Sequence, residues 1–423
     1  MSLSILRNSA DIFTMTKDAD SILCLDAIRF ITFTWVVAGH AIVFVADGDN
    51  GLQVLKISNQ LISDLFLNFF STVDTFFVLS GLLVAYSFFK KQHRDSDYMY
   101  TPLNWILFYV HRWMRLTPAY LMFIGFYVAW TPQIHDVWSS GIAQNLTQNV
   151  INCEERWWMN ALYINNFGDF LGTCYPISWF LAVDTQLYYT APIFLVSLYL
   201  SFKWGYLKII VFMNLVQCIA FLAYVDILKC FRKIFFSTEF ANFLYTKPWS
   251  RCSPFFTGVI CGYYIIQVRT QTIKIRRPKI WELSICWTLS TVTALAVIFT
   301  PYDYIRGASE WRVGVRSLYF SFSRFGWSAA VAWVVLACTF DWAGPVKKIL
   351  EHPIWYPLGR LSYCAYIVHF FAFNYFLDSD DRPTHFVSLG YTYLSVTIPV
   401  IFVSYLMALV WSCLIEIPFM RIE

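Results

Sequence analysis

Runs of about twenty apolar residues recur along this sequence, and no other feature limits its possible folds as strongly. In a helix, a run of this length crosses the roughly 30 Å apolar layer of a bilayer. Such runs predict membrane-crossing helices at 25–46, 64–88, 104–130, 177–200, 206–225, 252–269, 281–301, 315–340, 355–377 and 389–415. We therefore expect an all-α, polytopic bundle of about ten membrane-spanning helices, in a transmembrane domain at 25–417.

The composition fits a membrane protein rather than a soluble one. Hydrophobic residues make up 58% of the chain and charged residues 14%, whereas soluble domains carry about 25% charged residues. No basic tract interleaved with aromatic residues occurs outside the apolar runs, so nucleic acid is not an expected partner. The 11 cysteines include no CxxC pair, so no metal site is expected.

Loop charges predict the topology, because cytoplasmic loops carry an excess of lysine and arginine. The cytoplasmic N-terminal segment 1–24 lacks the features of a cleaved signal peptide, so the first run is expected to act as a signal anchor. With the tail 418–423 also cytoplasmic, the cytoplasmic loops hold Lys90, Lys91, Arg94, Arg269, Lys274, Arg276, Arg277, Lys279, Lys347 and Lys348. The exception is the stretch 226–251, which this topology places outside although it contains Lys229, Arg232, Lys233, Lys247 and Arg251.

The loop 131–176 falls on the lumenal or extracellular side in this topology. Asn145-Leu146-Thr147 is an N-glycosylation acceptor triplet, usable only on that side, although such triplets also occur by chance. Cys153 and Cys174 lie in the same loop, where oxidising conditions allow a disulfide. We therefore expect a disulfide-containing, multi-pass glycoprotein of the endoplasmic reticulum or the plasma membrane.

Arg29 and His40 lie inside the first apolar run, LCLDAIRFITFTWVVAGHAIVFV, with ten residues between them. Eleven positions are close to a whole number of helical turns, so both side chains share one face, roughly 16 Å apart along the axis. A cation and an imidazole within a membrane span are costly and indicate chemistry or transport. An imidazole can take a proton from a hydroxyl group near neutral pH. The alternative is a histidine that only packs against its neighbours.

Asp74 lies in the second run, in the segment VDTFFVLSG, where a carboxylate needs a partner. A pairing with His40 would fix the imidazole tautomer and stabilise the imidazolium. A structural ion pair with an arginine is the alternative. Ser80 and Gly81 in the same segment fit close helix packing better than chemistry.

Arg112 and Arg115 are spaced three residues apart in HRWMRLTPAY, near the cytoplasmic entry of the third run. Two guanidinium groups on one helix face suit a phosphate-bearing ligand. The alternative is that both side chains snorkel towards lipid headgroups.

Two later runs carry polar residues that we assign to a substrate cavity. In SWFLAVDTQLYY, Asp184 and Tyr188 share a helix face and Gln186 points elsewhere, while Trp179 either stacks on substrate or belongs to an aromatic belt. In LGRLSYCAYIVH, the cavity candidates are Arg360, Ser362, Tyr366 and His369, and the last three form one stripe that alternatively joins helices. Glu416 near the end of the last run is expected to pair with an arginine.

Five segments, taken in order, resemble the membrane acyltransferases called acyltransferase 3. They are the Arg29-x10-His40 spacing, VDTFFVLSG, HRWMRLTPAY, SWFLAVDTQLYY and LGRLSYCAYIVH, across about residues 20–420. The loop with WWMNALYINNF and CYPISWFLAVDTQ is most similar to the animal branch, the nose resistant to fluoxetine proteins. In that branch a cysteine-rich extracellular domain usually precedes the membrane part, whereas here only the segment 1–24 precedes the first run.

The resemblance implies O-acylation, in which an enzyme moves an acyl group, other than an amino-acyl group, from cytoplasmic acyl-CoA to an acceptor reached from the other side. The acceptor would be a lipid, sterol, sugar or small molecule, with acyl-CoA as cosubstrate and no bound cofactor. The family's essential arginine and histidine match Arg29 and His40, its acidic residue matches Asp74, and its later arginines match Arg112 and Arg115.

These expectations combine into one mechanism in a polar cavity between the first four helices and the ninth. Arg112 and Arg115 hold the donor phosphates, Arg29 positions the thioester arm, and His40 is the general base, oriented by Asp74. Two alternatives are a transporter of lipids or small hydrophobic compounds that uses the intramembrane Asp, His and Arg, and a catalytically silent membrane scaffold.

Overall fold

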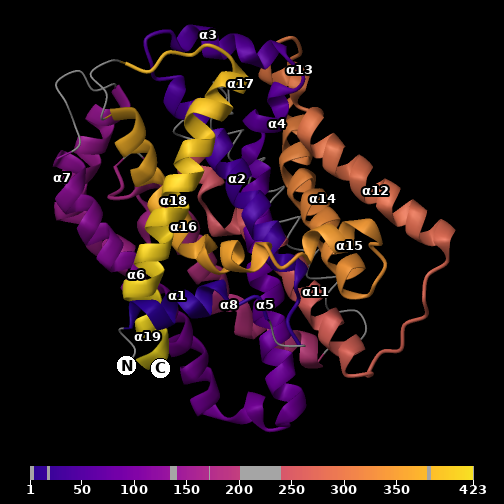
Figure 1. Cartoon of the computed structure of the whole chain (residues 1–423). Coiled ribbons are helices and arrows are strands. Elements are labelled where there is room, and N and C mark those ends of the chain that lie inside the picture. The colour runs from indigo at the N-terminus through magenta and orange to yellow at the C-terminus, as the bar shows by residue number, and fades with distance from the viewer. Residues whose placement is uncertain are drawn as a thin grey trace. The chain divides into compact units, whose positions relative to one another are not determined.

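The computed structural model describes residues 4–16, 20–133, 141–170, 172–200, 240–378 and 383–422, and the regular structure within them is entirely helical (Figure 1). The all-α class is therefore confirmed for these residues. Two compact units divide the chain. The first comprises Met1–Phe69, Leu107–Trp179 and Lys348–Glu423, and the second comprises Phe70–Ile106 and Phe180–Lys347.

The centre of the first unit is a group of long helices that pack side by side (Figure 1). α2 (Cys24–Val45) and α18 (Ile398–Trp411) both pack against α16 (Trp355–Asp378). α6 (Pro102–Trp130) adds an aromatic seam, in which the Phe123 ring lies against the rings of Phe371 and Trp411. Apolar residues occur on all sides of α2 and α16, so both helices can be covered on several faces by their neighbours.

The last helical stretch of the first unit contains two π-helical turns. α17 (Leu389–Thr392), η8 (Tyr393–Thr397), α18, η9 (Ser412–Glu416) and α19 (Ile417–Ile422) follow one another without a break. Each π turn ends two residues before a proline, Pro399 or Pro418. A proline ring clashes with the carbonyl of the residue four positions earlier, and the wider π turn relieves that clash.

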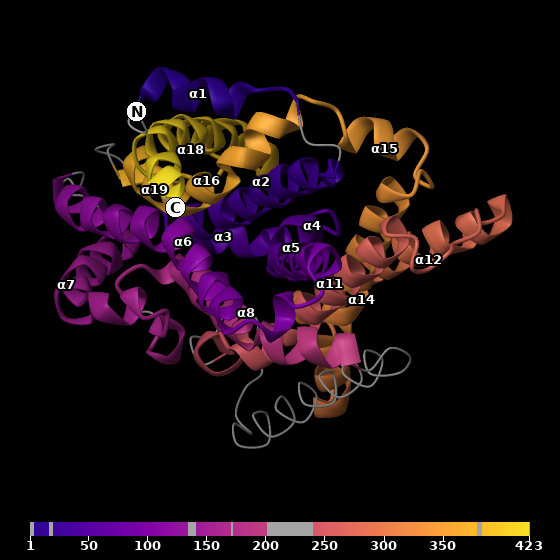
Figure 2. The same cartoon turned by 90° about the horizontal axis from the view of Figure 1, so that it is seen from below.

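A short helix that the apolar runs did not predict, α1 (Ile5–Phe13), precedes α2 and packs against α16 (Figure 2). Its buried face includes Asn8, whose amide donates to the Cys413 carbonyl at 2.8 Å. Arg360 of α16 donates to the carbonyl groups of Asp11, Ile12, Thr14 and Thr16 at the end of α1. These carbonyls lack partners within their own helix, and the guanidinium group supplies them.

The second unit is organised around α5 (Thr72–Arg94) and α11 (Pro248–Arg269), with α14 (Val313–Thr339) against both and α12 (Ile280–Phe299) against α14. Gly81 and Gly258 lie at the contact between α5 and α11. A Cβ atom at Gly81 would meet the Phe255 carbonyl oxygen, and one at Gly258 would meet the Val78 carbonyl oxygen. The two backbones touch because neither glycine has a side chain, which confirms the packing role predicted for Gly81.

The remaining helical elements are shorter or connect the units. α8 (Trp179–Leu200) begins at the boundary between the two units and continues in the second. The others are α3 (Gly51–Leu55), η1 (Lys56–Asn59), α4 (Ser63–Leu67), η2 (Phe69–Ser71), η3 (Tyr98–Tyr100), η4 (Thr131–Gln133), α7 (Gly141–Ala161), η5 (Asn165–Phe167), η6 (Pro176–Ser178), η7 (Ala241–Tyr245), α13 (Tyr302–Ile305) and α15 (Pro345–Leu350).

Within the described part of the chain, five helical stretches are long and apolar enough to cross a membrane: Cys24–Val45, Ser63–Arg94, Ile280–Ile305, Gly314–Thr339 and Leu389–Arg421. The expected ten crossings are thus not reproduced in full. The predicted run 206–225 lies outside the described residues. Helices α6, α8, α11 and α16 occupy predicted runs but carry arginine, aspartate, histidine or many tyrosines, which lower the mean hydropathy below that of a typical span.

Candidate active site

His40 and His369 lie next to each other in the first unit. His40 comes from α2 and His369 from α16, and His40 Nδ1 lies 3.1 Å from His369 Nε2. The two imidazole rings are parallel to within 3°. His369 is completely buried, whereas His40 is only half-buried. Two histidines that the sequence placed in separate roles thus form one pair.

The hydrogen bonds of His369 determine which nitrogen carries each proton. His369 Nδ1 lies 2.6 Å from the Tyr366 carbonyl oxygen, which can only accept, so Nδ1 donates. In neutral His369, Nε2 is then the acceptor, and His40 Nδ1 must donate to it. The Nε2 atom of neutral His40 therefore keeps its lone pair, which is the state that a general base requires.

Aromatic rings enclose the histidine pair. The Phe69 ring meets His40 edge to face at 5.3 Å between centroids, and the Phe33 ring meets His369 in the same way at 5.7 Å. Phe370, the residue after His369, lies against His40 at 6.3 Å. A Cβ atom at Gly39 would enter the Phe69 ring, so this glycine permits the approach of Phe69 to α2. The pair is thus held in a largely apolar setting.

Arg29 lies on the same helix as His40, α2, and nearer to its N-terminal end. Its guanidinium group contacts the carboxylate of Asp26 at 3.4 Å, and 24% of its side chain is exposed. The charge of Arg115 on α6 acts on Arg29 and repels it. Arg29 thus lies within electrostatic range of a second guanidinium group and has one carboxylate beside it, and paired guanidinium groups suit a phosphate or another anion. Arg112 lies on the same helix and is half-buried.

The other cavity candidates on α16 have partners within the first unit. Arg360 binds the end of α1, and the Ser362 hydroxyl donates to the Gly359 carbonyl of its own helix at 2.7 Å. The Tyr366 hydroxyl donates to the Ile177 carbonyl at 2.6 Å. Of the stripe predicted at 362, 366 and 369, only His369 is hydrogen-bonded to His40 among the described residues. Ser362 and Tyr366 bond elsewhere, Ser362 to its own helix and Tyr366 to Ile177.

Asp74 lies in the second unit, on α5, and its hydrogen bond goes to Arg251 of α11 at 2.6 Å. Both side chains are 1% exposed. The pairing of Asp74 with an arginine, one of the two expected arrangements, is therefore the one observed, and His369 is the partner of His40. Arg324 of α14 donates to the Ser250 carbonyl beside this pair.

Arg251 also explains part of the exception to the predicted topology. The topology prediction treats it as a loop charge in the stretch 226–251. In the structure it is 1% exposed inside α11 and is neutralised by Asp74. Lys247 is 6% exposed, so neither residue is a free loop cation. Lys229, Arg232 and Lys233 lie outside the described residues.

The remaining predicted cavity residues are on α8. Trp179 is buried at the first position of this helix, at the end of the first unit. Asp184 and Tyr188 are buried and Gln186 is half-buried, and all three belong to the second unit. The predicted shared face of Asp184 and Tyr188 follows from their places in one continuous helix.

Glu416 does not pair with an arginine. Its Oε2 atom accepts hydrogen bonds from Cys364 Sγ at 3.1 Å and from the Ser412 hydroxyl at 2.7 Å. The π turn η9 carries Glu416 into the buried face between α16 and the last helical stretch. The prediction failed because the sequence does not show which neighbour covers Glu416, and the π turn changes the face on which this residue lies.

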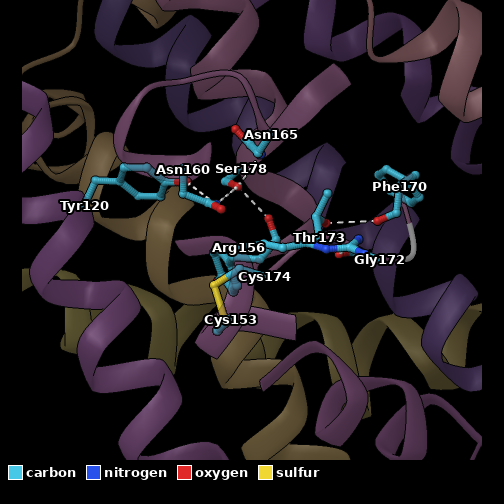
Figure 3. Close-up of a disulfide and its surroundings, with 11 residues drawn as sticks. Tyr120, Cys153, Arg156, Asn160, Asn165, Phe170, Gly172, Thr173, Cys174 and Ser178 are labelled. Atoms are coloured by element: carbon cyan, nitrogen blue, oxygen red, sulfur yellow. Dashed lines mark hydrogen bonds between the residues drawn. A yellow bond between two sulfur atoms is a disulfide. The ribbon is translucent and has the colours of Figure 1, made fainter. Parts of the chain in front are cut away.

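In the segment 131–176, the sulfur atoms of Cys153 and Cys174 lie at disulfide distance (Figure 3). Cys153 is on α7, and Cys174 precedes η6. Next to them, the Ser178 hydroxyl accepts from the amides of Asn160 and Asn165, at 3.0 and 2.9 Å (Figure 3). The glycosylation candidate Asn145 is within α7, and its side chain is outside the described part of the structure.

Comparisons with known proteins agree with the resemblance seen in the motifs. The family model described as an acyltransferase domain matches residues 22–417. Over all of its length and 53% of that protein, the chain is 28% identical to nose resistant to fluoxetine protein 6 of Caenorhabditis elegans. It is 22% identical to regulator of hypoxia-inducible factor 1 of Caenorhabditis elegans, over 98% of the chain and 82% of that protein.

A bacterial relative is also similar. The chain is 22% identical to a Staphylococcus aureus protein named "Putative O-acetyltransferase SACOL0978", over 78% of the chain and 50% of that protein. The chain thus spans about half the length of this relative and of nose resistant to fluoxetine protein 6. No solved structure matches the chain.

Proposed function

The chain belongs to the acyltransferase 3 family of membrane proteins, and from this we propose that it transfers an acyl group from cytoplasmic acyl-CoA to a hydroxyl group of an acceptor. The bacterial relative whose name refers to O-acetyl transfer supports the reaction class. A lipid, sterol, sugar or small molecule would serve as the acceptor, in the membrane of the endoplasmic reticulum or the plasma membrane.

The observation that carries this proposal is the proton arrangement at His40. The bond from His40 Nδ1 to His369 leaves the lone pair on Nε2 of His40, a residue that is only half-buried. His40 Nε2 would take the proton of the acceptor hydroxyl while that oxygen attacks the thioester carbonyl carbon. The carbon–sulfur bond then breaks, and the CoA sulfur leaves with the proton returned by His40.

His369 would assist this step without exchanging a proton itself. Its Nε2 atom accepts from His40 Nδ1 at 3.1 Å, and the developing positive charge on His40 strengthens that bond. His369 therefore takes the positioning role that we had expected for Asp74. A neutral imidazole supplies less charge stabilisation than a carboxylate, but it fixes the tautomer in the same way.

Arg29 and Arg115 would hold the donor. An anion bound near both guanidinium groups would offset their like charges, which favours the phosphate groups of acyl-CoA. Arg29 shares an α2 face with His40, so a donor bound by Arg29 could extend its thioester along α2 towards His40. Arg112 would contribute a further cation from the same turn of α6.

The test is acyl transfer by the purified protein in proteoliposomes supplied with labelled acyl-CoA. His40→Ala should lower turnover by about 10²–10⁴-fold, the usual contribution of a general base. The matched control is His385→Ala, because His385 is an exposed loop histidine that pairs with Asp49 and with neither member of the histidine pair. Equal acyl transfer by wild type and His40→Ala would refute the proposal.

The alternative function is the transport of a lipid or a small hydrophobic compound, in which the half-buried His40 and the partly exposed Arg29 would line the pathway. Ionisable residues inside membrane helices often mark transport pathways. The same vesicles separate the two functions, because a transporter moves a labelled compound without modifying it. Neither product nor movement, in protein that is folded, would instead support a scaffold.

A further inference from the structure

Two hydrogen bonds between phenols and carbonyls join the loop after Cys174 to a single turn of α16. Tyr175 of the loop donates its hydroxyl to the Ile367 carbonyl at 2.6 Å. Tyr366 of the helix donates its hydroxyl to the Ile177 carbonyl, also at 2.6 Å. One bond runs from loop to helix and the other from helix to loop, so any sliding of one segment along the other breaks both.

The turn that is held in this way is the one that orients His369. The carbonyl group of Tyr366 accepts from His369 Nδ1 at 2.6 Å, and His369 Nε2 accepts from His40 at 3.1 Å. Tyr366 is therefore bonded to the loop through its hydroxyl and to His369 through its carbonyl, and His369 is bonded to His40. The loop is thus connected to the candidate base, His40, indirectly through Tyr366 and His369.

The other side of the loop is attached to α7. Cys174, directly before Tyr175, is at disulfide distance from Cys153. Ser178, three residues after Tyr175, donates to the Tyr175 carbonyl at 2.5 Å and accepts from Asn160 of α7 at 3.0 Å. The residues 174–178 are therefore fixed to α7 on one side and to α16 on the other, and we call them the loop clamp.

We propose that the loop clamp positions the His40–His369 pair and that the Cys153–Cys174 bridge controls it. The positioning residues are Tyr175 in the loop clamp and Tyr366, which binds the clamp from α16. A dithiol reductant would break the sulfur–sulfur bond, giving two cysteine thiols and its own oxidised disulfide. The inference rests on the proposed function, because it concerns the regulation of the same histidine pair.

The expected effect of loosening the clamp is on turnover and not on donor binding. A mobile α16 turn lets His369 move away from His40, so His40 Nε2 no longer holds its lone pair in a fixed direction. The donor would be held through Arg29 and Arg115, which belong to α2 and α6 and not to the loop clamp or α16. We therefore expect kcat to fall while KM for acyl-CoA is unchanged.

The experiment compares Tyr175→Phe and Tyr366→Phe with Tyr319→Phe in proteoliposomes. Tyr319 makes the same kind of bond, donating to the Val297 carbonyl at 2.6 Å, but in the second unit. Each clamp variant should lower kcat about tenfold, as expected for one lost hydrogen bond, with KM for acyl-CoA within about twofold. A kcat equal to that of Tyr319→Phe, or a drop confined to KM, would overturn the proposal.

A second measurement tests the bridge. Cys153→Ser with Cys174→Ser should lower kcat as the tyrosine variants do and should make turnover insensitive to a dithiol reductant, whereas Cys286→Ser should retain the sensitivity of the wild type. Cys286 is a free cysteine on α12. A wild-type kcat in the Cys153→Ser, Cys174→Ser variant would refute the proposal that the disulfide regulates turnover.

A third measurement does not depend on catalysis. Diethyl pyrocarbonate acylates imidazole nitrogens that hold a free lone pair, and mass spectrometry locates the product. In the clamped protein both nitrogens of His369 are engaged, so the clamp and bridge variants should raise modification at His369 and leave His385 unchanged. If His40→Ala retains full acyl transfer but His369 becomes reactive in these variants, the proposed function fails and the clamp stands. Unchanged reactivity at His369 would refute the clamp.

Discussion

The carboxylate of Asp74 lies 2.6 Å from the guanidinium group of Arg251, and both side chains are 1% exposed. These residues are 177 positions apart in the sequence and join α5 to α11. Around them the two helices approach until their backbones touch at Gly81 and Gly258. The pair is therefore a structural tie between two closely packed helices of the second unit.

Breaking this pair should destabilise the protein strongly. Asp74→Asn leaves the Arg251 charge buried without its counterion, and such changes cost about 3–5 kcal/mol. The free energy of unfolding in detergent, measured by denaturant titration, should fall by that amount. Asp303→Asn is the control, because its partner Arg306 is in an exposed i,i+3 pair that contributes about 0–1 kcal/mol. Equal losses in both variants would mean that the Asp74–Arg251 pair has no special role.

The partner of His40 should be replaceable only by another acceptor. His369→Ala removes the acceptor for His40 Nδ1 and should lower kcat by roughly 10²-fold, within the range of general-base effects. His369→Gln can offer its side-chain oxygen to His40 and should recover part of that loss. Turnover of the two variants at saturating acyl-CoA decides the matter. Equal kcat values for alanine and glutamine would show that the hydrogen bond to His40 is not what matters.

Removing the arginine proposed to hold the donor should weaken donor binding. Arg29→Gln takes away one charge-assisted contact to phosphate, so KM for acyl-CoA should rise about tenfold, with the largest effect at low salt. Arg29→Lys should not restore it fully, because an ammonium group lacks the planar fork of a guanidinium group. Arg277→Gln, at an exposed loop position, is the control. A KM that stays at the wild-type value would contradict the assignment of Arg29.

The contact between α5 and α11 should not tolerate a methyl group. Gly81→Ala places a carbon against the Phe255 carbonyl, and overpacking of this kind costs about 1–3 kcal/mol. Gly125→Ala on α6 meets nothing within 4 Å and should be neutral or slightly stabilising, because alanine favours helix over glycine. Thermal unfolding of the two variants gives the comparison. A higher midpoint for Gly81→Ala would show that the helices do not touch there.

The sequence by itself determined where the helices lie. Every predicted apolar run within the described residues is occupied by helix, because a run of that length cannot leave its backbone groups unpaired in a bilayer. It also determined that Arg29 and His40 share a face, since helical geometry alone fixes that relation. The Cys153–Cys174 pair was predictable because both cysteines lie in one segment between two apolar runs.

The tertiary structure alone decided the partners. His40 meets His369, 329 residues away, while Asp74 meets Arg251 and Glu416 meets Cys364 and Ser412. Each run of sequence fixes the faces of its own helix but not the neighbour that covers each face. That choice depends on the packing of all the helices together, on the contact at Gly81 and on the π turn before Glu416, and the energies that set it come from residues far apart in the chain.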